Sequence, residues 1–127
     1  SLIEALNRYK NSFNSYPLDR LAQAGAVASL QDNDYFVACN QKVIALRHDV
    51  TQALTQLGFT VLPSQANFVF AKPPASMGDT KQLFEKLRAQ GVIVRHFNKP
   101  KISDYLRITI GTAEQNQRLL DTLTNLV

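Results

Sequence analysis

The chain has 127 residues, 45% of them hydrophobic and 19% charged, with a formal net charge of +4. This length fits one compact domain or slightly more, and the composition is that of a globular protein rather than a disordered chain. The longest uncharged stretch contains Gln, Gly and Ser and is far shorter than the about 20 apolar residues that span a bilayer. We therefore expect no transmembrane helix and no signal peptide.

The basic residues are scattered along the chain, and only residues 95–101, RHFNKPK, are locally dense. A positive charge without a basic stripe favours small acidic molecules over nucleic acid as partners. The single cysteine, Cys39, cannot form an internal disulfide or a cysteine-based metal site, which is compatible with a reducing compartment. We expect a cytoplasmic protein that binds neither nucleic acid nor a membrane.

The first third of the chain is predicted to be helical, apart from one loop. Residues 2–10 have apolar side chains at helical spacing, with neither an initiator methionine nor a cap before them, which suggests a piece of a longer protein. Residues 11–17 have the composition of a loop. A second helix is predicted with Pro17 in its first turn and a contact face of unusually small residues as far as Ala28.

A long helix is predicted from Asn33 or Asp34 to Leu57, because apolar residues recur at alternating intervals of three and four. Gly58 then stands where glycine commonly ends a helix. About 24 residues would extend roughly 36 Å, which is long enough to bridge two domains. We expect Cys39, on this apolar seam, to be an inert core thiol. The seam consists of Phe36, Cys39, Val43, Leu46, Val50, Ala53 and Leu57.

The rest of the chain has the pattern of short strands and two further helices. Asp79 with Gln82, and Thr112 with Gln115, resemble capping boxes that open these helices. The order is therefore ααα followed by ββαββα, an α/β (α+β) arrangement of a small sheet with helices on one face, beside the long helix. The predicted strands are FTVLP (59–63), NFVFAK (67–72), VIVRHF (92–97) and YLRITIG (105–111).

Arg107 is a permanent positive charge within an apolar, β-branched strand. Period-two alternation places Arg107 on one face with Tyr105 and Thr109, and places Leu106 and Ile108 on the other. Because the helices must cover the Leu and Ile face, Arg107 points away from the core. It could pair there with a cross-strand carboxylate on a solvated face, or it could face a cleft and bind a carboxylate or phosphate bidentately.

Arg95 and Asn67 are two further candidates for ligand contacts. Arg95 shares a strand face with Ile93 and Phe97 and raises the same question as Arg107. Asn67 opens an otherwise apolar strand, so its amide could be buried and would then need hydrogen-bond partners, although turn chemistry explains it equally well.

Other chemistry has little support in the sequence. His48 and His96 lack further ligands at metal spacing, so we expect polar surface or edge roles and no metal site. Lys10 follows an amphipathic helix without the desolvating pocket that a Schiff-base lysine needs, and we predict no catalytic residue in this chain. An RNA-binding sheet is disfavoured, because paired exposed aromatic residues are not evident and Tyr105 is the only obvious one.

Three stretches of the chain carry a resemblance to a known family. They are NSFNSYPLDRLAQAGAVASL (11–30), GFTVLPSQANFVFAK (58–72) and GVIVRHFNKPKISDYLRITIGTAEQN (91–116). These stretches and the spacing between them resemble the C-terminal third of the histidinol-phosphate aminotransferase family, fold-type I enzymes that depend on pyridoxal phosphate. The resemblance implies amino transfer between histidinol phosphate or imidazole-acetol phosphate and glutamate or 2-oxoglutarate, in histidine biosynthesis, by a homodimer.

The resemblance also implies a domain organisation and a division of labour. Residues 1–33 would be the tail of the large cofactor-binding domain, residues 34–57 the interdomain helix, and residues 58–127 the C-terminal small domain. Arg107 matches the strand arginine that anchors the phosphate of one substrate and a carboxylate of the other, and Arg95 matches an arginine nearer the mouth of the same cleft.

Asn67, within the motif SQANFVF, is a third substrate-binding candidate by this resemblance. The family's Schiff-base lysine, its pyridine-binding aspartate and its cofactor-phosphate ligands align before residue 1, so we expect the chain alone to be inactive. Two alternatives stay open. One is a standalone regulatory module that binds a small anion, and the other is an aminotransferase for aromatic or other amino acids.

Overall fold

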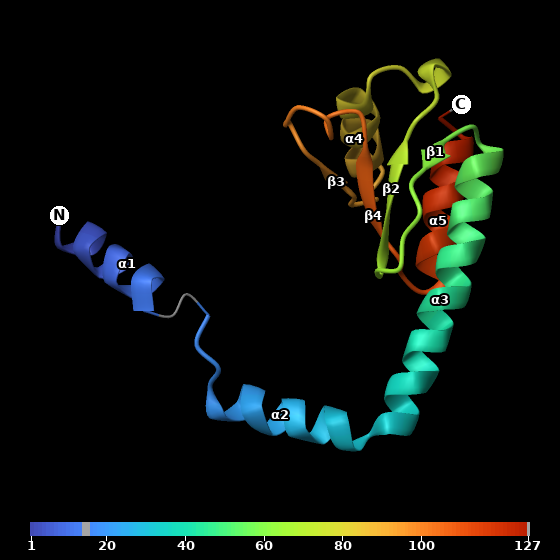
Figure 1. Ribbon diagram of the computed structural model, residues 1–127. Coiled ribbons are helices and arrows are strands. Elements are labelled where there is room, and N and C mark those ends of the chain that lie inside the picture. The colour runs from blue at the N-terminus through green and yellow to red at the C-terminus, as the bar shows by residue number, and fades with distance from the viewer. Residues whose placement is uncertain (14–15, 127) are drawn as a thin grey trace. The chain divides into compact units, whose positions relative to one another are not determined.

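The computed structural model describes residues 1–13 and 16–126, and the chain divides into two compact units, Ser1–Ala38 and Cys39–Val127. The order of elements confirms the predicted ααα and ββαββα succession, with one added 3-10 turn (Figure 1). None of the described helices is long and apolar enough to cross a membrane. The elements are α1 Leu2–Phe13, α2 Arg20–Gln31, α3 Asn33–Gln56, β1 Thr60–Val61, β2 Phe68–Lys72, the 3-10 turn Ala75–Met77, α4 Thr80–Ala89, β3 Arg95–His96, β4 Leu106–Thr109 and α5 Ala113–Thr124.

The first unit corrects two details of the predicted helices. Helix α1 continues to Phe13, so the loop predicted for residues 11–17 is wrong for its first three residues, and residues 14–15 lie outside the described part. Helix α2 begins at Arg20 rather than around Pro17, because the carboxylate of Asp19 accepts a hydrogen bond from the backbone N–H of Ala22 at 2.8 Å and caps the helix there.

Helix α3 has the predicted extent, and Gly58 ends it with a positive φ of 86°. Only the C-terminal half of the predicted seam packs into the core, where Val50 is buried. Leu54, which the seam did not include, is fully buried. Cys39 is half-buried and outside the core cluster, so its prediction as a core thiol is wrong.

The strands of the second unit form one antiparallel sheet in the order β1-β2-β4-β3. The first and third strands are shorter than predicted, with two residues each. The first pairs no further than Leu62, because Pro63 has no N–H to donate. The third strand begins only at Arg95. Before it, the backbone N–H of Val92 donates to the carbonyl of Leu87 at 2.9 Å, at the C-terminal end of α4.

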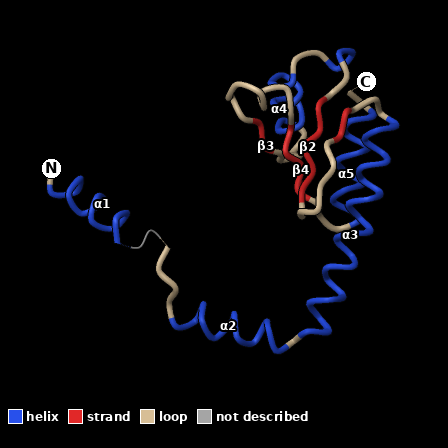
Figure 2. The backbone as a smooth tube through the Cα atoms, viewed as in Figure 1, coloured by secondary structure: helices blue, strands red, loops and turns tan. Residues whose placement is uncertain are grey.

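A single core fills the space between the sheet and three helices (Figures 1 and 2). Val69 and Ala71 of β2 and Leu106 and Ile108 of β4 alternate inward, so helices α3, α4 and α5 cover the same face of the sheet. The helices contribute Val50, Leu54, Leu83, Leu87, Leu119 and Leu123 to this core. The other face of β2 and β4 is free of these helices, which decides where a ligand can reach the sheet.

Helix α5 is fixed to the end of β4 by polar contacts. The predicted capping box is present, with Thr112 and Gln115 bonding reciprocally. At Asp79 only the carboxylate half of the predicted box is formed, and it accepts from the backbone of Lys81 and Gln82. The side chain of Asn116, which is buried, accepts from the N–H of Gly111 at 2.9 Å and donates to its carbonyl at 3.2 Å.

Replacing Asn116 with leucine is expected to lower the free energy of unfolding by about 1–3 kcal/mol, because both backbone groups of the half-buried Gly111 lose their hydrogen-bond partner. Urea unfolding measures this difference. Gln117→Ala, at an exposed neighbouring position of α5, serves as the control and should stay within about 0.5 kcal/mol of the parent. An unchanged midpoint for Asn116→Leu would show that these contacts contribute nothing net.

Candidate functional site

The side chain of Arg107 lies on the face of β4 that the alternation of apolar and polar residues predicts. In β4 the side chains of Leu106 and Ile108 are buried in the core, Arg107 is half-buried, and Thr109 is exposed. Arg107 therefore lies on the face of the sheet that the helices leave uncovered. The charge avoids the apolar core, where an unpaired cation would be very costly.

The register of the sheet surrounds Arg107 with an aromatic ring and a second cation. Phe70 of β2 is its partner on one side, and Arg95 of β3 is its partner on the other. The cross-strand carboxylate that we considered is not there, and the ion pairs found among the described residues involve neither arginine. The Nε of Arg107 is buried and has no hydrogen-bond partner within the described chain. This arrangement leaves a partly desolvated cation that an anion could satisfy.

Aromatic rings gather around these two arginines. The Cζ of Arg107 lies 5.4 Å from the ring centroid of Phe68 and 5.9 Å from that of Phe97, and the Cζ of Arg95 lies 5.2 Å from Phe97. Such distances are typical of cation–π contacts. Phe70 stacks on Phe97 with centroids 6.1 Å apart. We call this surface the arginine–aromatic face. It consists of Arg95, Arg107, Phe68, Phe70, Phe97 and Tyr105.

The prediction that the sheet lacks paired exposed aromatic residues is not contradicted, because these rings are half-buried, but the face carries more aromatic residues than Tyr105 alone. Sequence reasoning missed Phe68 and Phe70, although alternation within NFVFAK already places both on the face opposite Val69. Phe97 lies beside Arg95, as the alternation predicts, although it follows a strand only two residues long. These rings are half-buried, and two of them contact a guanidinium group rather than standing free for base stacking.

Asn67 has no hydrogen bond to either arginine among the described residues. Its side chain is exposed, which makes the considered burial of its amide wrong, and its carbonyl accepts from the N–H of Ile110 at 2.8 Å. The turn before it is held by Arg47 of α3, which donates to the carbonyl of Ala66 at 2.7 Å. The turn is also closed by the hydroxyl of Ser64. Turn chemistry thus accounts for the polar residues of this segment.

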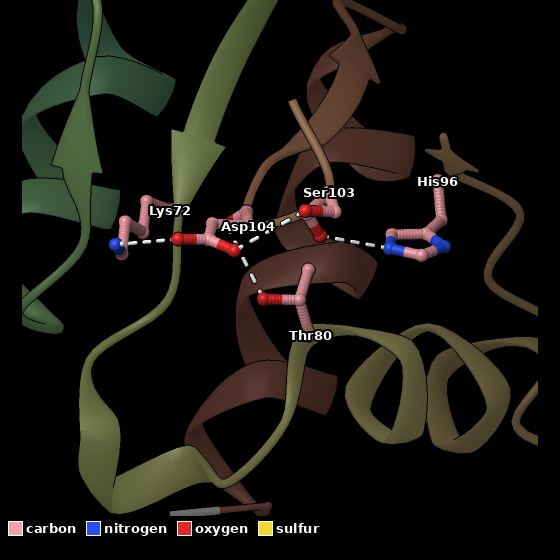
Figure 3. A network of polar contacts seen from close by, with 5 residues as sticks. All are labelled: Lys72, Thr80, His96, Ser103 and Asp104. Atoms are coloured by element: carbon pink, nitrogen blue, oxygen red, sulfur yellow. Dashed lines mark hydrogen bonds and ion pairs between the residues drawn. The ribbon is translucent and has the colours of Figure 1, made fainter. Parts of the chain in front are cut away.

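A network of polar contacts holds the segment between β3 and β4 (Figure 3). The ammonium group of Lys72 contacts the carboxylate of Asp104 at 2.8 Å, and the hydroxyl of Thr80 donates to the backbone carbonyl of Asp104 at 3.2 Å. The Nε2 of His96 lies 2.9 Å from the carbonyl of Ser103, and it must carry the proton because a carbonyl only accepts. This network fixes where Arg107 enters the sheet.

The ion pair in this network predicts a small dependence of stability on pH. The hydrogen bond from Lys72, and then its charge, hold the pKa of Asp104 below its ordinary 3.8. A carboxyl with a lowered folded-state pKa stabilises the fold above its ordinary pKa, and this stabilisation is lost as the pH falls through the lowered value. We expect Asp104→Asn to lower Tm slightly at pH 6, because the pair is exposed.

The difference in Tm between parent and Asp104→Asn should disappear in acid, below the lowered pKa of Asp104. Thermal scans from pH 6 to pH 2 measure it. Asp121→Asn, on the exposed side of α5, is the control for loss of a carboxylate outside this network. A Tm difference that stays constant down to pH 2 would contradict the role of this ion pair.

The remaining polar side chains offer little for chemistry. His96 is half-buried in the edge strand β3, and His48 is exposed on α3, as predicted for edge and surface residues. Among the described residues, no group of three or more His, Cys, Asp or Glu could hold a metal ion. Every lysine of the chain, Lys10 included, is exposed. The arginine–aromatic face is thus the strongest candidate site.

Comparison with known proteins agrees on one family. The sequence profile described as "Aminotransferase class I and II" matches residues 1–123. The chain is 62% identical over 123 residues to histidinol-phosphate aminotransferase 2 of Psychrobacter arcticus, which covers 97% of this chain and 32% of that protein. It is 59% identical over 122 residues to histidinol-phosphate aminotransferase of Acinetobacter baumannii, covering 96% of this chain and 33% of that protein.

Two solved structures share the fold. Histidinol-phosphate aminotransferase of Clostridium acetobutylicum superimposes with a TM-score of 0.78 at 21% identity, over 92% of this chain and 36% of that chain. Histidinol-phosphate aminotransferase of Sinorhizobium meliloti, in complex with pyridoxal-5'-phosphate, superimposes with a TM-score of 0.77 at 20% identity, over 94% of this chain and 34% of that chain. The chain spans about a third of the length of these relatives. The profile match over nearly the whole chain shows that it belongs to the class I and II aminotransferase family.

Proposed function

We propose that this chain is the substrate-anion-binding part of a histidinol-phosphate aminotransferase. The full-length enzyme would transfer an amino group between histidinol phosphate or imidazole-acetol phosphate and glutamate or 2-oxoglutarate, in histidine biosynthesis. The relatives that cover this chain at about 60% identity carry that name. The single observation that carries the proposal is Arg107, a half-buried cation whose Nε has no hydrogen-bond partner among the described residues and whose sheet neighbour is a second arginine.

The chemistry of the two substrate pairs fits this site. One pair carries a phosphate, and the other carries a carboxylate at the end of its side chain. A guanidinium group binds either anion bidentately, so one arginine can serve both half-reactions. Its contribution is orientation: an anchored anion holds the amine or keto group in line with the reacting atoms, and the aromatic walls keep water away from the ion pair.

We assign the principal anchor to Arg107 and a second, outer contact to Arg95. Arg107 is half-buried with its Nε covered, whereas Arg95 is exposed on the edge strand β3. Two cations in one row of the sheet repel each other, and a doubly charged phosphate would relieve that repulsion better than a single carboxylate. A contact from Asn67 stays a prediction, and its side chain is exposed.

The lysines of this chain do not fit the covalent attachment of pyridoxal phosphate. A Schiff-base lysine works from a desolvated pocket, and each lysine here is exposed. In this proposal the cofactor-binding lysine and the cofactor-phosphate ligands belong to a part of the enzyme outside these 127 residues. The chain alone is then inactive, and its residues act only on the substrate side of the active site.

The proposal includes the domain assignment expected from the resemblance. Residues 1–33 form the tail of the large domain, residues 34–57 the interdomain helix, and residues 58–127 the small domain. The compact unit that starts at Cys39 contains all of the arginine–aromatic face, which supports a separate substrate-binding domain. A homodimer and a cytoplasmic location stay predictions, as does the alternative of a standalone anion-binding module.

Steady-state kinetics on the full-length enzyme test the substrate. We expect histidinol phosphate with 2-oxoglutarate to be the preferred pair, with inorganic phosphate as a competitive inhibitor against histidinol phosphate. Phenylalanine and tyrosine are the comparison substrates, because the rings of Phe70 and Tyr105 beside the arginines would also suit an aromatic amino acid. A higher kcat/KM for phenylalanine than for histidinol phosphate would reject the proposed substrate and favour the aromatic alternative.

A further inference from the structure

Phe97 is the one ring of the arginine–aromatic face that both guanidinium groups contact in the described structure. Arg95 Cζ lies 5.2 Å from its centroid, and Arg107 Cζ lies 5.9 Å from it. The ring itself is supported by Phe70, which stacks on it at 6.1 Å with an interplanar angle of 11°. The ring of Phe97 is thus a surface shared by two cations that come from neighbouring strands.

The two cations need such a surface because of the sheet register. Arg95 and Arg107 are direct partners across β3 and β4, and like charges in directly opposite positions destabilise a sheet. No carboxylate forms an ion pair with either of them among the described residues. The negative π face of an aromatic ring attracts both guanidinium groups and opposes their separation into solvent.

We propose that Phe97 is a positioning residue of the anion site, whose ring holds the guanidinium groups of Arg95 and Arg107 together to receive the substrate anion. This inference rests on the proposed function of Arg107. The ring itself does not bind the anion. Because Phe97 lies directly after β3, any change in its packing displaces the contacts of both arginines at once, whereas Phe68 contacts only Arg107.

The test uses the full-length enzyme with Phe97→Leu, which keeps an apolar side chain and removes the π face. Calorimetry measures the Kd of inorganic phosphate, and steady-state assays measure KM and kcat for histidinol phosphate and 2-oxoglutarate. We expect phosphate binding and both KM values to weaken about three- to tenfold, as for the loss of two cation–π contacts, with kcat within about twofold. Phe97→Tyr keeps the π face and should restore the parent values.

Phe84→Leu is the matched control. Phe84 of α4 is also a half-buried phenylalanine, and its ring lies 6.0 Å from that of His96, but it is outside the arginine–aromatic face and makes no cation–π contact among the described residues. We expect the phosphate Kd of this variant to stay that of the parent. Equal losses in Phe84→Leu and Phe97→Leu would overturn the inference, because they would show a general effect of losing a packed ring.

Arg107→Ala separates this inference from the proposed function. Unchanged phosphate binding in Arg107→Ala would reject the function and the inference together. A loss in Arg107→Ala with an unchanged Kd in Phe97→Leu would reject only the role of Phe97. If Phe97→Leu does not yield folded enzyme, Phe97→Met takes its place, since it also fills the space without a ring, and parent-like binding by that variant would equally reject the inference.

Discussion

Replacing Arg107 with alanine in the full-length enzyme is expected to lower kcat/KM about ten- to a hundredfold for both histidinol phosphate and 2-oxoglutarate. Losing a charge-assisted contact in a partly dry site costs about 1.5–3 kcal/mol, which corresponds to this range. The Nε of Arg107 is buried, and the rings of Phe68 and Phe97 lie next to the guanidinium group, so solvent cannot easily replace the lost contact. Initial rates at varied substrate concentration measure the effect.

Two variants sharpen this experiment. Arg107→Lys keeps the charge but loses the planar, bidentate geometry, and we expect it to recover only part of the loss. Arg88→Ala removes an exposed arginine of α4, outside the arginine–aromatic face, and should leave both substrates unaffected. If Arg107→Ala retained the kcat and KM of the parent for both substrates, Arg107 would not be the anion anchor.

Replacing Leu54 with alanine is expected to destabilise the protein by about 2–5 kcal/mol. Leu54 is completely buried where α3 meets the sheet, and its truncation removes buried methyl groups and leaves a cavity that the core can close only in part. Chemical unfolding of parent and variant measures the difference in the free energy of unfolding, provided that both show the same dependence on denaturant concentration. The size of the effect reports how well α3 is attached to the domain that carries Arg107.

Gln52→Ala is the control for Leu54→Ala, because it lies two residues earlier on α3 with an exposed side chain. It should stay within about 0.5 kcal/mol of the parent. A loss below about 1 kcal/mol for Leu54→Ala would indicate that α3 is loosely packed on the sheet.

Structural features that depend on residues close together in the sequence were predicted well. Arg107 points away from the core because adjacent residues of a strand face opposite sides, and this follows from β4 alone. The capping box at Thr112 and the glycine that ends α3 are likewise interactions within one turn of the chain. The start of α2, which was predicted too early, also depends on a local interaction. The side chain of Asp19 caps the helix two residues after Pro17.

The environment of Arg107 could not be predicted in this way. Its neighbours Phe70 and Arg95 are distant in the sequence and reach it through strand pairing. Alternation indicated the face of each residue, but it did not indicate which residues stand opposite one another. For this reason a cross-strand carboxylate remained an alternative for Arg107, and the rings of Phe68 and Phe70 were overlooked. Phe97 was placed with Arg95 but not with Arg107.

The sequence by itself determined the order of the helices, the direction of Arg107 and the resemblance to the aminotransferases, because these depend on local spacing and on residues that stand next to one another. Only the tertiary structure decided that Arg107 has a second arginine beside it and that Phe97 contacts both. It also decided that the Nε of Arg107 has no hydrogen-bond partner in the part of the chain that the structure describes. The physical reason is that register and burial arise from contacts between distant segments, which a one-dimensional pattern does not contain.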